Sequence, residues 1–160
     1  MKKIASFRID HTKLGVGIYL NRVNVCQGLS VAVTYDIRMC APYKDEPMPR
    51  DAMHTIEHIG ATYLRNHKKF GNNIIYFGPM GCATGFYLIV QPMGMIMEDV
   101  IELLHGMFEY IAKFPSLHKK IPGATKKECG NYKLHWLANA AGLARDFLEK
   151  CSWELENYPS

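Results

Sequence analysis

The chain has 160 residues, of which 48% are hydrophobic and 21% charged, and its formal net charge is +4. This length and hydrophobic content predict a single domain, residues 1–160, with one core. No apolar run reaches the roughly eighteen residues that a membrane span needs, and lysines in separated pairs make nucleic acid a poor partner. The cysteines are odd in number and scattered, which favours a reducing cytoplasm over a disulfide scaffold.

The order of elements predicts a mixed α and β fold. Five segments have the composition and alternation typical of strands: Ile4–Asp10, Ile18–Val25, Leu29–Cys40, Ile74–Phe77 and Gly85–Val90. The first of them also lacks the apolar core of a signal peptide. Helical spacing predicts helices at about Asp51–Lys68, Glu98–Lys113 and Tyr132–Cys151, and Pro-rich loops are expected at 41–49 and 114–123. Because strands cluster early, we expect an α+β fold, a largely antiparallel sheet packed against about three to four helices.

The first predicted helix contains the pattern His54-x-x-Glu57-His58. Side chains four residues apart lie one above the other on a helix, so His54 and His58 can bind one divalent cation with Glu57 at the rim. Ala61 shares this arc and leaves room above the metal. H-x-x-E-H is a known metalloenzyme signature. The alternative interpretation is two surface histidines on an amphipathic helix.

A catalytic metal needs a third protein ligand, and Cys129 is the best candidate. It follows Lys126-Lys127-Glu128 and precedes the helix expected from about Tyr132. Neighbouring lysines and a helix N-terminus would both stabilise a thiolate there. Taken alone, the pattern fits a structural cysteine better than a ligand.

A glycine-rich turn between two apolar strands presents a second cysteine. Gly78, Gly81 and Gly85 surround Cys82, and glycines let the backbone approach a ligand closely and adopt positive φ. Beside a divalent cation, the pKa of this thiol would fall, which would give a nucleophile or base at neutral pH. A tight hairpin with an incidental thiol is the alternative.

Taken together, these motifs resemble the S-ribosylhomocysteine lyase family. The resemblance covers nearly the whole chain and rests on segments in this order: Ser6-Phe7, Asp10-His11, Asp36-Ile37-Arg38, His54 to His58, Arg65-Asn66-His67, Pro79 to Cys82, Thr84 to Tyr87, Ile121-Pro122 and Cys129-Gly130. It implies a small α+β fold and an obligate homodimer with active sites at the subunit interface. It also implies ferrous iron as the working metal, which zinc or cobalt can replace.

The implied reaction cleaves the thioether of S-ribosyl-L-homocysteine without net redox change. Its products are L-homocysteine and 4,5-dihydroxy-2,3-pentanedione, the precursor of autoinducer-2. The reaction would serve either quorum sensing or only the recycling of methyl-transfer by-products. Moving a carbonyl along the opened ribose needs a Lewis acid and positioned acid/base groups. The resemblance implies three metal ligands, two acid/base groups and three substrate contacts: His54, His58 and Cys129; Glu57 and Cys82; and Ser6, His11 and Arg38.

Three residues depart from the family's pattern: Tyr43, Tyr76 and Ala83. They bear on substrate affinity, chiefly at the homocysteine end, and not on the metal ligands or the acid/base pair. Two other classes share part of the pattern. An inverted-motif metallopeptidase would use Glu57 as base for water attack, but it takes a downstream glutamate as third ligand and has a longer chain. A non-catalytic metal-binding module would close its site with a fourth protein ligand.

Overall fold

Residue 4 and residues 7–159 are described by a computed structural model of the chain. Along this part, the elements are β1 (Gly17–Cys26), β2 (Leu29–Arg38), α1 (Arg50–Arg65), the short 3-10 helix η2 (Gly71–Asn73), β3 (Ile74–Pro79), β4 (Gly85–Val90), α2 (Met97–Leu117), α3 (Leu137–Lys150) and β5 (Leu155–Glu156). The predicted α+β class is confirmed.

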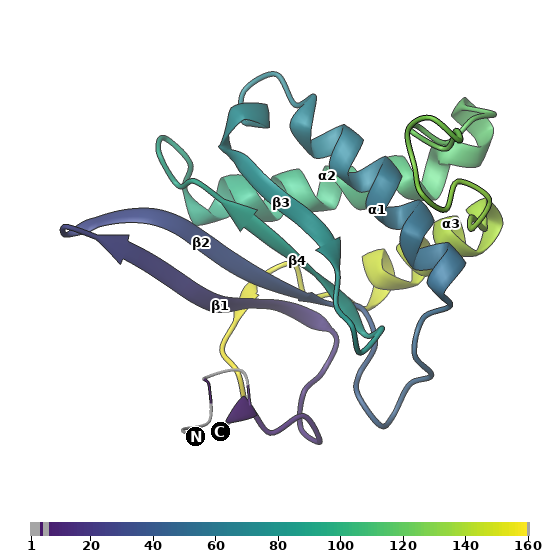
Figure 1. Cartoon of the computed structure of the whole chain (residues 1–160). Coiled ribbons are helices and arrows are strands. Elements are labelled where there is room, and N and C mark those ends of the chain that lie inside the picture. The colour runs from purple at the N-terminus through teal and green to yellow at the C-terminus, as the bar shows by residue number, and fades with distance from the viewer. Residues whose placement is uncertain (1–3, 5–6, 160) are drawn as a thin grey trace.

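The strands form one sheet in the order β3-β4-β2-β1-β5. All pairs are antiparallel except β1 with the short β5, so the expected antiparallel character is also confirmed. The α-helices pack together on one face of the sheet, and the β1–β2 hairpin projects beyond them (Figure 1). Alternate residues of β2, namely Val33, Tyr35 and Ile37, join the helices in the core.

Helix α1 lies close to the sheet because of one glycine. A Cβ on Gly60 would stand 2.6 Å from the Phe77 ring of β3 and 3.0 Å from the Met107 sulfur of α2. Only a residue without a side chain allows this approach. The buried face of α1 therefore packs directly against β3 and α2.

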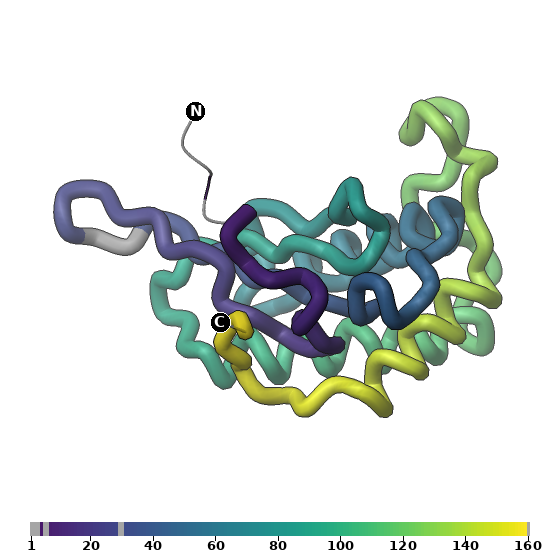
Figure 2. The backbone as a smooth tube through the Cα atoms, turned by 90° about the horizontal axis from the view of Figure 1, so that it is seen from below, coloured from purple at the N-terminus to yellow at the C-terminus, as the bar shows by residue number. Residues whose placement is uncertain are grey.

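The first predicted strand is wrong within the described residues. Residues 7–13 form turns instead: the Thr12 N–H donates to Asp10 Oδ1 at 3.0 Å, and the Lys13 N–H donates to the Asp10 carbonyl at 3.1 Å. A short aspartate that binds the backbone ahead of it competes with strand pairing. This segment and the C-terminal segment lie next to each other at one end of the sheet (Figure 2).

Two helix boundaries also differ from expectation. Helix α2 continues through Pro115 to Leu117, where a loop was predicted. Helix α3 begins at Leu137 rather than near Tyr132, because the preceding amides bond elsewhere. The Leu134 N–H donates to the Asn131 carbonyl at 3.0 Å, and the Trp136 N–H donates to the Thr55 hydroxyl of α1.

All five cysteines are free thiols, in line with the expectation of no disulfide scaffold. None of the helices in residues 7–159 is both long and apolar enough to cross a membrane.

Candidate metal and acid–base site

The histidine pair lies on a half-buried arc of α1. His54, Glu57, His58 and Ala61 are all intermediate in exposure, beside the fully buried stripe that packs into the core. This is the separation of faces that the sequence predicted. The helix therefore presents its polar arc to whatever covers it.

The segment of residues 118–135, between α2 and α3, covers this arc. The Nδ1 of His54 bonds the Leu134 carbonyl and the Nδ1 of His58 bonds the Pro122 carbonyl, both at 2.8 Å. A carbonyl only accepts, so each Nδ1 carries a hydrogen, and in the neutral ring that leaves the lone pair of Nε2 for a metal. Gly123 has φ +69° and a Cβ there would stand 3.2 Å from His58 Nδ1, so the close approach of this segment requires glycine.

Cys129 comes to the same place from the middle of that segment. Its Sγ lies 3.4 Å from His54 Nε2, and the ligand atoms of His54, His58 and Cys129 all lie within 4.8 Å of one another. The Asn131 N–H lies 3.4 Å from this sulfur and donates to it. The predicted help from a helix N-terminus is wrong, since α3 starts only at Leu137; a backbone amide stabilises the thiolate instead.

These donors fit a catalytic transition-metal ion. Two neutral imidazoles with free Nε2 lone pairs and one thiolate suit ferrous iron, zinc or cobalt. Backbone carbonyls hold both rings in the correct tautomer, which is the usual outer support of a metal-bound histidine. Among the described residues the group has three members, and three protein ligands are typical of a site that leaves a position for water or substrate.

A third histidine, which the sequence did not reveal, packs against this cluster. The His135 ring is stacked on His54 with centroids 4.3 Å apart and lies 4.9 Å from that of His58. Its Nδ1 lies 3.2 Å from Thr55 Oγ1. That hydroxyl already donates to the Asp51 carbonyl, so His135 is the donor. Burial, followed by the positive charge that His54 and His58 carry when protonated, lowers the pKa of His135 to about 4.

Thr55 holds His135 in its place beside His54. Its side chain is fully buried, and its Oγ1 also accepts the Trp136 N–H at 3.0 Å. One hydroxyl thus ties α1 to the backbone that precedes α3. His135 and Trp136 are adjacent, so the same hydroxyl holds the ring against the ligand His54.

The second cysteine stands in a turn held by backbone bonds. The Met80 N–H donates to the Gly85 carbonyl at 2.9 Å and the Ala83 N–H to the Met80 carbonyl at 3.0 Å. The left-handed residue of this turn is Ala83, at φ +59°, and not one of the glycines as expected. Gly85 is required for a different reason: a Cβ there would lie 2.3 Å from the Ile37 carbonyl of β2.

Glu57 faces this turn across a small pocket of about 290 Å³. The pocket is lined by His54 and Glu57 of α1 and by Gly81 and Ala83, the neighbours of Cys82. The helix and the turn thus bring one candidate metal ligand and one carboxyl group next to the backbone on either side of Cys82. Of the three departures from the family's pattern, Ala83 alone lines this pocket; Tyr43 is 85% and Tyr76 41% exposed.

Arg38 connects the sheet to this thiol. Its cross-strand neighbours are Gly17 and Gly85. Arg38 Nη1 contacts Cys82 Sγ at 3.7 Å and also donates to Thr84. Burial raises the pKa of the Cys82 thiol, but hydrogen bonds from Thr84 and the charge of Arg38 outweigh it, so the pKa lies below its ordinary value.

His11, another predicted substrate contact, lies in the N-terminal segment at the end of the sheet. His11 Nδ1 bonds the Ile9 carbonyl at 2.9 Å, and its charge acts on Asp36, the buried partner of Arg38. The structure therefore brings His11 towards Arg38 rather than into the metal group. Ser6 lies outside the described residues.

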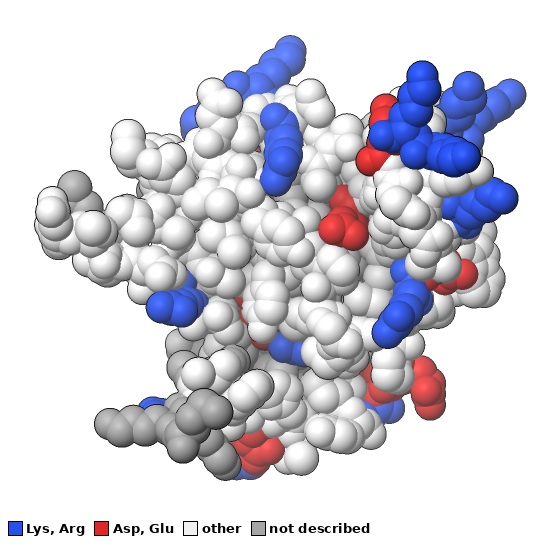
Figure 3. Space-filling model, viewed as in Figure 1, with Lys and Arg blue, Asp and Glu red and all other residues white. Residues whose placement is uncertain are grey.

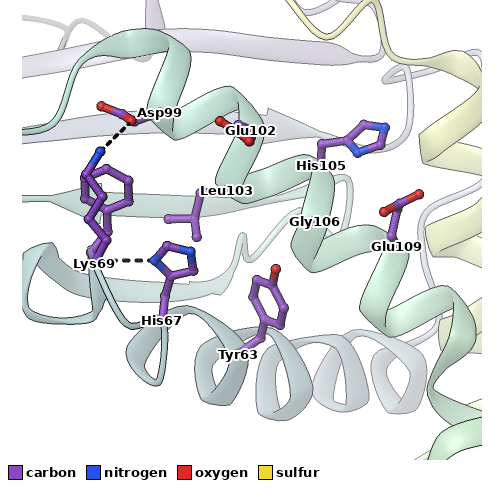
Figure 4. Close-up of a pocket in the computed structure, with 10 residues that line it drawn as sticks. Tyr63, His67, Lys69, Asp99, Glu102, Leu103, His105, Gly106 and Glu109 are labelled. Atoms are coloured by element: carbon purple, nitrogen blue, oxygen red, sulfur yellow. Dashed lines mark hydrogen bonds and ion pairs between the residues drawn. The ribbon is translucent and has the colours of Figure 1, made fainter.

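Two further surface features are separate from this site. A cleft of about 420 Å³ between α1 and α2 is lined by polar groups such as His67, Asp99 and Glu109, and it contains none of the predicted site residues (Figure 4). In Figure 3, lysine and arginine side chains gather over the segment between α2 and α3. Lysine pairs that are separate in the sequence thus meet on the segment that carries Cys129.

Comparison with known proteins identifies the family. A sequence model of the S-ribosylhomocysteinase (LuxS) family matches residues 4–157. The S-ribosylhomocysteine lyase of Desulfotalea psychrophila is 47% identical, and the match covers 100% of both chains. That of Borreliella afzelii is also 47% identical, over 93% of this chain and 92% of the relative. That of Clostridium acetobutylicum is 42% identical over 99% of both chains. The chain belongs to the S-ribosylhomocysteinase family.

Proposed function

We propose that this chain is an S-ribosylhomocysteine lyase, a metal-dependent carbon–sulfur lyase that releases L-homocysteine and 4,5-dihydroxy-2,3-pentanedione. The observations that carry the proposal are the His54–His58–Cys129 group and the pocket beside it, where His54 and Glu57 face the turn that contains Cys82. Full-length relatives with this name support the same substrate.

The metal group supplies one part of the chemistry. A divalent ion held by His54, His58 and Cys129 supplies Lewis-acid polarisation of substrate oxygens. The carbonyls of Leu134 and Pro122 fix both imidazoles for this task. We propose ferrous iron as the resident ion, with zinc or cobalt as substitutes.

Cys82 and Glu57 move the carbon-bound protons. The carbonyl of the opened ribose migrates from C1 to C3 through two enolisations, and each one takes a proton from one carbon and returns it to the next. The lowered pKa of the Cys82 thiol increases the share of thiolate, the form that can accept such a proton. Glu57, on the opposite wall of the pocket, serves the other end of the migrating carbonyl.

The last step breaks the thioether. With the carbonyl at C3, the C4 proton is acidic, and a base removes it. The electron pair of that C–H bond forms the C4=C5 double bond, while the pair of the C5–S bond leaves on sulfur as the homocysteine thiolate, which takes up a proton. The resulting enol tautomerises to the diketone, so no oxidant or reductant is consumed.

We further propose that the active site is completed in a homodimer. The β1–β2 hairpin projects beyond the helices and exposes large apolar side chains, including Leu20 (40% exposed), Val23 (46%) and Val25 (62%). Ser6, His11 and Arg38 then contact substrate, partly across the interface. Light scattering should give about twice the 18.2 kDa chain mass; a fully active monomer would contradict the shared site.

Five free thiols support a reducing, cytoplasmic compartment for this enzyme. The activity test is release of free thiol from S-ribosylhomocysteine by protein purified without oxygen and assayed for metal. We expect thiol release in proportion to bound metal. A metal-loaded protein that releases no thiol but cleaves peptides would favour the metallopeptidase, and one inert to both would favour a non-catalytic metal module.

A further inference from the structure

The C-terminal segment reaches the outer face of the sheet beside Arg38. Strand β5 pairs in parallel with β1 at Ile18 and Tyr19. Beyond β5, Tyr158 stacks on Tyr19, with ring centroids 5.1 Å apart and ring planes 5° from parallel. The end of the chain is therefore fixed next to the network that contacts Cys82.

The phenol of Tyr158 makes two hydrogen bonds with defined directions. Asn21 Nδ2 donates to Tyr158 Oη at 2.9 Å, and Tyr158 Oη donates to Asp36 Oδ2 at 3.0 Å. Burial, followed by the nearby Asp36 charge, raises the pKa of Tyr158. The phenol thus keeps its proton, and that proton goes to Asp36.

The same carboxylate oxygen holds Arg38. Asp36 Oδ2 accepts Arg38 Nη2 at 2.6 Å, and the other terminal nitrogen of that guanidinium faces Cys82. An unbroken series of contacts therefore runs from Tyr158 through Asp36 and Arg38 to the thiol. Asn21 bonds the phenol at the start of this series.

This ion pair is buried but not fully satisfied. Asp36 and Arg38 are 1% and 2% exposed. Asp36 Oδ1 and Arg38 Nε have no hydrogen-bond partner among the described residues. The pair is therefore oriented by few bonds, and loss of the one from Tyr158 leaves Asp36 free to turn and take the guanidinium with it.

We propose that Tyr158 is a positioning residue for Cys82: it fixes the Asp36 carboxylate so that Arg38 presents Nη1 to the sulfur. This inference rests on the proposed acid/base role of Cys82. A purely structural Tyr158 would only anchor the chain end, and its loss would lower stability without changing the thiol.

The groups that face this network are few. Arg38 of β2 is the charged group that acts on Cys82, and the Tyr87 phenol of β4 also interacts electrostatically with this thiol. Asp36 is influenced by Arg38, by Tyr158 and by His11 of the N-terminal segment. Alkylation is followed at Cys82 itself, so its midpoint reports the state of this thiol.

Tyr158→Phe is the test variant, because it removes the hydroxyl and keeps the ring on Tyr19. In the full-length, zinc-loaded enzyme, the rate of iodoacetamide alkylation at Cys82 is followed against pH by peptide mass spectrometry. We expect the midpoint to rise by about half to one pH unit and alkylation at pH 7.5 to slow about three- to tenfold. The turnover number should fall by a similar factor, with little change in KM.

Tyr19→Phe is the matched control. It removes the neighbouring phenol hydroxyl, which bonds the Gly15 carbonyl at 3.2 Å, and keeps the same ring stack. Its alkylation midpoint should equal that of the parent. Asn21→Ala should shift the midpoint in the same direction as Tyr158→Phe but less, since it loosens the phenol without removing it. Thermal unfolding of each variant reports whether the fold is intact.

An unchanged midpoint in folded Tyr158→Phe, with a raised one in Arg38→Lys, would overturn the inference. An equal rise in Tyr19→Phe would also overturn it, since any disturbance of the chain end would then suffice. The proposed function fails by a different result: if Cys82→Ser turns over normally, Cys82 is not the acid/base group. A midpoint shift in Tyr158→Phe would still establish the positioning of the thiol in that case.

Discussion

The histidine arc of α1 and the Arg38 network on the sheet are two parts of the proposed site, and they are built in opposite ways. His54 and His58 come from one turn of one helix, and their support comes from backbone carbonyls. Cys82 is tuned by Arg38 of β2 and by Thr84 of its own turn, with Asp36 and Tyr158 behind Arg38. The histidine pair is therefore a local arrangement, whereas Cys82 depends on the assembled sheet.

This difference predicts different sensitivities. Changes near the metal group should alter metal content first, because its rings are held by backbone groups that few substitutions disturb. Changes around Arg38 should alter the reactivity of the thiol first and leave metal content normal. Each experiment below tests whether the two regions respond separately.

The largest effect is expected for the metal ligands. His58→Ala or Cys129→Ala leaves two ligands, too few for tight binding of a catalytic ion, so metal per subunit and thiol release should both be lost. Elemental analysis of protein purified without oxygen measures the first. Cys26→Ala, which removes an exposed thiol of β1, is the control and should retain both. Full occupancy in Cys129→Ala would remove Cys129 from the ligand group.

The next largest effect is expected for the acid/base pair. Glu57→Gln and Cys82→Ser should each reduce turnover at least about a hundredfold, the usual scale for a positioned proton transfer. Metal content should stay normal, since neither belongs to the ligand group. Glu102→Gln changes a carboxyl group in the cleft between α1 and α2 and should have no effect on turnover. Metal loss in Glu57→Gln would show that the two regions are not separable.

A smaller effect is expected for the support of His54 by His135. Thr55→Val removes the hydroxyl that accepts from His135 and Trp136, and loss of such outer support typically weakens metal binding about ten- to a hundredfold. Competition with a zinc chelator measures this affinity. Thr55→Ser keeps the hydroxyl and should retain the parent affinity. Equal affinity in folded Thr55→Val would limit His135 to packing.

The smallest effect is expected for the charge on the thiol. Arg38→Lys keeps a cation for Asp36 but cannot reach Asp36 and Cys82 together. The pKa of Cys82 is lowered in the folded protein, so losing this contact should move the alkylation midpoint to higher pH and slow alkylation at neutral pH. Zinc affinity should not change. A midpoint shifted to lower pH would show that Arg38 does not lower the pKa of the Cys82 thiol.

The local part of this site could be predicted from the sequence. Helical periodicity gave α1 within a few residues, and the four-residue spacing put His54 and His58 on one face. Cys129 was harder, because its position depends on a long irregular segment, and its supposed helix N-terminus was wrong. Its surroundings made it a candidate ligand, and the resemblance to a known family implied that role.

The non-local part could not be predicted. His135 lies in an irregular stretch, and only the packing of the chain before α3 against Thr55 brings it to the metal group. Tyr158 reaches Asp36 through a two-residue parallel strand, too short to show any pattern. The alternation at Ile4–Asp10 was misleading because Asp10 bonds the backbone ahead of it. Tertiary contacts decided each of these positions.

Carbon NMR of labelled S-ribosylhomocysteine with metal-loaded Glu57→Gln and Cys82→Ser tests the central claim most directly, that a metal group and a separate acid/base pair share one reaction. Because the two groups serve different steps, one variant should accumulate a ketose isomer, and the other should exchange little or no substrate proton with solvent. Both should keep one metal per subunit. Normal conversion to homocysteine by both variants would contradict the account.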